Sequence, residues 1–113
     1  MRILTEEELY EMSNVRPFRT GLPMVVWIHE SSGNERHYAR IKVSVNYGDK
    51  VNMQEGFFTV TVPNKEIIGD TRNIKNRDIT LVKKWIDLNK ELIISLFVAE
   101  IDMGVFLEKV IMA

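Results

Sequence analysis

Two histidines, His29 and His37, are the residues best suited to chemistry in this sequence. The segment between them is centred on Gly33 and carries the carboxylates Glu30 and Glu35. If the flanking segments form a hairpin in a symmetric register, His29 stands opposite His37 at its mouth, with Glu35 nearby. Two imidazoles and a carboxylate suit a first-row divalent metal, as in a metal-dependent hydrolase. The default interpretation is that all three are solvated side chains beside a loop, and the metal site is the alternative to it.

A second candidate site follows the outward side of the strand predicted over 37–47. Arg36, Tyr38, Arg40 and Lys42 alternate along it, and Phe57 of the next predicted strand could flank them. Cations interleaved with aromatic rings resemble a stacking platform for single-stranded nucleic acid. The formal net charge of -1 provides no broad attraction to phosphate, and any half-exposed strand shows similar alternation. Nucleic-acid binding therefore stands as an alternative function.

The sequence lacks the residue patterns that other classes of enzyme need. The chain has no cysteine, which excludes disulfides, a thiol nucleophile and cysteine-based metal sites. It contains no GxSxG elbow and no glycine-rich nucleotide loop, so we predict a non-enzymatic protein without a cofactor. No signal peptide or membrane span is recognisable, and we expect a cytoplasmic protein. The 113 residues carry no linker or repeat and are predicted to form one domain, 1–113.

The elements that must position these residues are predicted from periodicity. Apolar residues alternate in 37–47 and 56–62, with Phe58, Val60 and Val62 inward, whereas 22–28 is apolar throughout, as in a strand buried on both faces. Residues 65–68 suit a short edge strand. We predict a short N-terminal helix capped by Thr5 and ending before Pro17. The fold class is α+β: a three- to four-stranded, mainly antiparallel sheet with a long helix in the C-terminal half packed on one face.

That long helix is predicted over 77–98, with Asn76 as its cap. Its apolar side covers about half the circumference, which requires burial against the sheet and also against terminal helices or a second subunit. Trp85 and Asn89 lie on this side, and a buried Asn89 must tie the helix to a backbone group of the sheet or fix the register of a subunit contact. Residues 105–111 suit either a short helix capped by Asp102 or a strand.

Residues of the long helix also carry a family resemblance. Leu81, Val82, Trp85, Glu91, Ile93 and Ile94 follow the helix pattern of a small bacterial family called domain of unknown function 4160. The family's Pro-His-Phe-His-Ala signature corresponds to residues 35–39 here, where only His37 is a histidine, and Asn89 stands where the family tends to have histidine. The resemblance implies a small intracellular bacterial protein, sometimes encoded near toxin–antitoxin-like genes, without an established activity. Our leading hypothesis is an interaction module that binds a protein partner or a second copy of itself.

Overall fold

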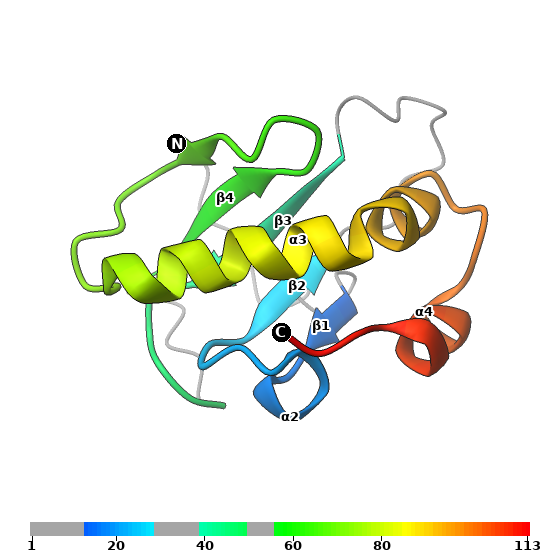
Figure 1. Ribbon diagram of the computed structural model, residues 1–113, viewed down its shortest axis with the longest axis horizontal. Helices are drawn as coiled ribbons and strands as arrows, with labels where there is room; N and C mark the ends of the chain where they lie inside the picture. The colour runs from blue at the N-terminus through cyan, green and yellow to red at the C-terminus, as the bar shows by residue number, and fades with distance from the viewer. Residues whose placement is uncertain (1–12, 29–38, 50–55) are drawn as a thin grey trace.

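The computed structural model describes residues 13–28, 39–49 and 56–113. It is an α+β fold in which a long helix crosses one face of a five-stranded antiparallel sheet (Figure 1). The predicted fold class is confirmed, with a slightly higher strand count than the three to four expected. The elements are β1 (Ser13–Val15), α2 (Pro17–Thr20), β2 (Val26–Ile28), β3 (Arg40–Ser44), β4 (Phe57–Thr61), β5 (Ile67–Ile68), α3 (Asn76–Phe97) and α4 (Met103–Lys109). The strands follow one another across the sheet in chain order.

The inner face of the sheet, which α3 covers, is apolar. Ile28, Ile41, Val60 and Ile67 form one row of directly paired residues across four strands. The predicted inward residues Phe58, Val60 and Val62 are buried in the same core as Val82, Trp85 and Ile86 of α3. Alternation along β3 and β4 thus decides which side chains meet α3, as expected for half-buried strands.

The symmetric hairpin register is wrong where the structure describes it. That register would place Ile28 opposite Tyr38, but Ile28 pairs with Ile41 and Trp27 with Lys42. The difference is an odd number of residues, and an odd shift moves every side chain of a strand to the opposite face. Burial of Ile28 and Ile41 together in the core favours the observed pairing. His29 and His37 themselves lie outside the described residues.

The sequence predicts an N-terminal helix that ends before Pro17, but Ser13–Val15 is the edge strand β1. Val15 pairs with Val26 and is almost fully buried, so pairing and burial outweigh local helix propensity. The earlier residues of the predicted helix lie outside the described part. Pro17 instead opens the single turn α2, which ends when the N–H of Gly21 donates to the carbonyl of Pro17. Gly21 has a φ of 77°, a left-handed conformation that glycine adopts readily.

Helix α3 begins one residue earlier than predicted, so Asn76 is its first residue and not its cap. The N-cap is Lys75, whose side chain makes no capping hydrogen bond. Its backbone N–H instead donates to the Tyr47 hydroxyl at 2.9 Å, and that hydroxyl donates to Asp78 at 2.6 Å. The phenol thus stands between the N-cap amide and the carboxylate three residues later, two groups that a capping box joins directly. Partial burial and the hydrogen bond to Asp78 raise the pKa of Tyr47.

The second side of α3 is covered by the C-terminal part of the chain. Asp102 accepts a hydrogen bond from the N–H of Val105 and caps α4. The segment 105–111, for which the sequence allows either a helix or a strand, therefore begins as a helix. Phe106 of α4 is buried with its ring 6.5 Å from that of Trp85, in an edge-on arrangement. The terminal helix therefore covers the wide apolar arc of α3, and the arc by itself no longer calls for a second subunit.

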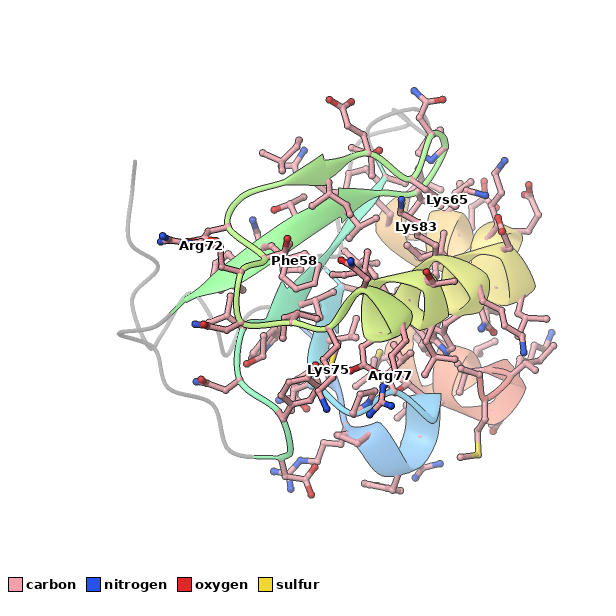
Figure 2. All side chains as sticks on the ribbon, turned by 60° about the vertical axis from the view of Figure 1, so that its left-hand side comes forward. Phe58, Lys65, Arg72, Lys75, Arg77 and Lys83 are labelled. Carbon is pink, nitrogen blue, oxygen red and sulfur yellow. The ribbon has the colours of Figure 1, made fainter. Side chains whose placement is uncertain are left out.

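The segment between β5 and α3 begins at Gly69, where the backbone lies close to β4. A side chain at Gly69 would begin only 3.3 Å from the Cα and Cβ atoms of Phe58. Phe58 lies beneath this segment in Figure 2, between the sheet and the start of α3. Because Gly69 has a φ of 121°, it meets both the spatial and the backbone requirement.

Candidate functional sites

The structure describes only part of the sites that the sequence predicts. The metal candidates His29, Glu35 and His37, and the cation and aromatic candidates Arg36 and Tyr38, lie outside the described residues. Residues 13–28, 39–49 and 56–113 contain no group of three or more histidine or acidic side chains that could hold a metal ion. The remaining candidates Arg40, Lys42 and Phe57 all lie on the outer face of the sheet.

This outer face is the side of the sheet opposite α3. Asn14, Trp27, Lys42, Thr59 and Ile68 form one continuous row of paired residues across all five strands. A parallel row pairs Arg40 with Thr61. Cations of β3 therefore face hydroxyl groups of β4, with the Trp27 ring on the other side of Lys42.

Lys42 is held in place by its neighbours. Its ammonium lies 4.7 Å from the centre of the Phe57 ring and donates to the Thr59 hydroxyl at 3.2 Å. Partial burial, followed by repulsion from Arg40, lowers the pKa of Lys42 below its usual value. The cation is thus oriented by an aromatic ring and a hydroxyl, and no carboxylate of the described residues neutralises it.

The aromatic rings of this face are not arranged as a stacking platform. Trp27 is only 3% exposed, and its ring centre lies 6.1 Å from that of Phe57 at a tilt of 49°. Phe57 is partly buried, and the Lys42 ammonium lies over its ring. Sequence reasoning missed Trp27 because the unbroken apolar run of β2 does not reveal which residues face outward. The cations of the proposed platform are positioned, but the described rings offer little face for a base.

A cationic region also surrounds the start of α3, where Figure 2 shows Lys75 and Arg77. The N-cap amide there is already bound by Tyr47, and Asp78 adds a carboxylate to the first turn. Two other cations, Lys65 and Arg72, form ion pairs with Asp87 at 2.8 Å and with Asp70 at 2.7 Å. Carboxylates of the protein itself therefore already neutralise part of this positive charge.

A second surface was not predicted from the sequence. We call it the α2–strap surface; it consists of α2 and the extended segment 110–113. The N–H of Ala113 donates to the carbonyl of Thr20 at 2.7 Å, which joins the two segments. Phe18, Ile111 and Met112 are 65%, 53% and 55% exposed on them. A lone aromatic residue among charged and turn residues, Arg-Pro-Phe-Arg-Thr-Gly, was the available sequence signal.

Asn89 attaches this strap to α3. Its side-chain nitrogen donates to the carbonyl of Ile111 at 2.9 Å, and its oxygen accepts from the N–H of Ile111 at 2.8 Å. The same nitrogen also donates to the carbonyl of Trp85. The tether that a buried amide requires therefore ends on the C-terminal strap and not on the sheet. Trp85 is buried, and its Nε1 has no hydrogen-bond partner in the described structure.

Comparison with known proteins found no matching family model, curated protein or solved structure. The resemblance to domain of unknown function 4160 therefore stays a prediction. None of the described helices is long and apolar enough to cross a membrane.

Proposed function

We propose that this domain is a non-enzymatic interaction module of the cytoplasm, which binds an acidic segment of a partner protein through the α2–strap surface. The supporting observation is the exposure by more than half of three large apolar side chains, Phe18, Ile111 and Met112, on two joined segments. Apolar and aromatic anchors of this kind form the centres of protein interfaces.

The charge around Phe18 supports an acidic partner. Arg16 and Arg19 flank it in sequence, and both are exposed. Neither forms an ion pair with a described carboxylate, and the Arg19 guanidinium lies 5.2 Å from the centre of the Phe18 ring. Carboxylates beside an apolar anchor of the partner would pair with these arginines while the anchor covers Phe18.

The strap is also held in shape by other parts of the fold. Asn89 fixes Ile111 from one side, and Thr20 fixes Ala113 from the other. A pre-ordered surface loses less conformational freedom on binding than a mobile tail does, which favours affinity. The exposed side chains are thus presented by main-chain contacts that leave them available.

Site-specific photo-crosslinking tests the proposal. A benzophenone amino acid at position 18 should capture a discrete partner in cells that encode the protein, whereas the same group at exposed Lys84 on α3 should not. The toxin–antitoxin-like context implied by the sequence resemblance makes the product of an adjacent gene the first partner to test. The purified partner should then bind the wild type at least about tenfold more tightly than Met112→Asp or Arg19→Glu. Equal affinities would reject the α2–strap surface.

Self-association is a second outcome of the same experiment. If the captured partner is another copy of the chain, sedimentation velocity should show a concentration-dependent dimer that Met112→Asp disrupts. A strict monomer with equal labelling from positions 18 and 84 would contradict the interaction-module proposal.

A further inference from the structure

Four residues on the outer face of the sheet form a compact group of hydrogen-bond donors. Arg40 pairs directly with Thr61, and Lys42 with Thr59. The Thr61 N–H donates to the main-chain carbonyl of Glu66 on the β5 side, and the Val62 N–H donates to the main-chain carbonyl of Ala39 on the β3 side. Arg40–Thr61 and Lys42–Thr59 are therefore pairs without mutual backbone hydrogen bonds, the geometry in which facing side chains lie closest, with Cα atoms about 4.5 Å apart.

The hydroxyl groups of this cluster retain hydrogens to donate. The Thr59 oxygen accepts from Lys42, and the Thr61 oxygen accepts from the N–H of Glu66 at 2.9 Å. Each hydroxyl keeps its own hydrogen, which can rotate toward an incoming acceptor. The described structure shows no acceptor that takes either hydrogen.

Neither cation forms an ion pair with a described carboxylate. Arg40 is exposed, Lys42 is half-buried, and their mutual repulsion favours an anion placed between them. Alternate residues of a strand lie about 7 Å apart and neighbouring strands about 4.8 Å, so long cationic side chains and short hydroxyls can reach one small anion. A guanidinium, an ammonium and two hydroxyls suit the several oxygens of a tetrahedral anion better than the two of a carboxylate.

We propose that Arg40, Lys42, Thr59 and Thr61 form a binding site for a phosphate group, either free inorganic phosphate or a phosphodiester of a nucleic-acid backbone. The site is separate from the α2–strap surface and does not depend on it. Contact with phosphate needs no base stacking, which agrees with the burial of Trp27 and the position of Lys42 over Phe57. Phe57 in this arrangement positions the ammonium and does not contact a base.

Titration with inorganic phosphate and with a short oligothymidylate, followed by amide NMR shifts, tests the site and separates the two sources. Perturbations should centre on residues 40–42 and 59–61 for at least one of the two ligands. Arg40→Gln should weaken that binding about tenfold and Thr59→Val several-fold, because each removes one contact to the anion. Arg72→Gln, which alters a cation paired with Asp70 at a different site, should leave affinity unchanged.

The ligand that binds identifies the source. Binding of oligothymidylate that weakens steeply with salt supports a backbone phosphodiester, whereas binding of phosphate alone supports a free ion. No localised perturbation by either ligand would overturn the proposal. Equal losses in Arg40→Gln and Arg72→Gln would also overturn it, because binding would then reflect general surface charge.

Discussion

The two faces of the sheet are built from alternate residues of the same strands, yet they differ in nearly every physical property. Phe58 points inward, is 1% exposed and belongs to the main core. Its neighbour Phe57 points outward, and the Lys42 ammonium lies over its ring. Inward residues hold α3 by apolar contact. Outward residues of β3 and β4 instead place cations opposite hydroxyls, so one pair of strands serves stability on one side and presents donors on the other.

Replacing the two phenylalanines should give the largest difference between the faces. Phe58→Ala opens a cavity beneath α3 and should cost about 3–5 kcal/mol of unfolding free energy. Phe57→Ala removes a half-buried ring and should cost about 1 kcal/mol. Urea unfolding followed by tryptophan fluorescence measures both values. Equal losses would mean that the outer cluster of Val25, Trp27 and Phe57 contributes as much as the main core.

Asn89 is a buried polar residue on the apolar side of α3, and its replacement tests what its hydrogen bonds contribute. Asn89→Leu keeps a similar volume but leaves the N–H and carbonyl of Ile111 without their side-chain partner, which should cost about 1–3 kcal/mol. The amide of Ile111 should also exchange with deuterium faster. Exposed Lys90, the next residue, offers the control Lys90→Ala with a change below about 0.5 kcal/mol. Unchanged exchange at Ile111 in Asn89→Leu would show that other contacts hold the strap.

Tyr47 joins the end of the sheet to the start of α3, so Tyr47→Phe should cost about 1 kcal/mol near neutral pH. The raised pKa of the folded phenol predicts a pH dependence. Tyrosine in the unfolded chain loses its proton near pH 10, whereas the folded phenol keeps its proton to a higher pH. The free energy of unfolding therefore falls as the pH rises from about 10 to the pKa of the folded phenol. The Tyr47→Phe variant lacks that loss, which urea unfolding at pH 7 and above pH 10 can measure. A fall of the same size in the variant would assign it to other groups.

Lys42→Met should affect stability only slightly, because the outer face is specialised for donors. Lys42→Met removes a half-buried charge and one hydrogen bond but keeps apolar contact with Phe57, so the net change should be below about 1 kcal/mol. The lowered pKa of Lys42 means that the unfolded chain holds more protons between the folded pKa and 10.5. Wild-type stability therefore gains with rising pH in that window, and the variant lacks this gain. A loss as large as that of Phe58→Ala would remove the distinction between the faces.

The sequence predicted the elements whose pattern is local. Alternation in 56–62 identified Phe58, Val60 and Val62 as inward residues, and apolar periodicity identified α3 within one residue at each end. Asp102 correctly marked the start of α4 as one of two alternatives. These features depend on neighbours within a few positions along the chain, which a single sequence contains.

Features that depend on distant partners were not predicted. The β2–β3 register follows from which residues of an unbroken apolar run enter the core, and the run itself has no alternation to reveal this. The strand β1 results from pairing with β2, against a local helix signal. The partner of Asn89 lies in the non-periodic strap, and Thr59 and Thr61 join Arg40 and Lys42 only through the β3–β4 register.

The attachment of the strap has a consequence for how this surface can diversify. Asn89 forms its hydrogen bonds to Ile111 with the main chain, in the way that a neighbouring strand would, and these bonds impose no requirement on the side chain there. By contrast, the backbone of Ala113 lies so close to Gly21 that a methyl group at position 21 would approach within 3.1 Å of its nitrogen. Position 111 is therefore free to vary in size and charge while position 21 is not. Recognition of different partners could evolve through residue 111 without cost to the scaffold that displays it.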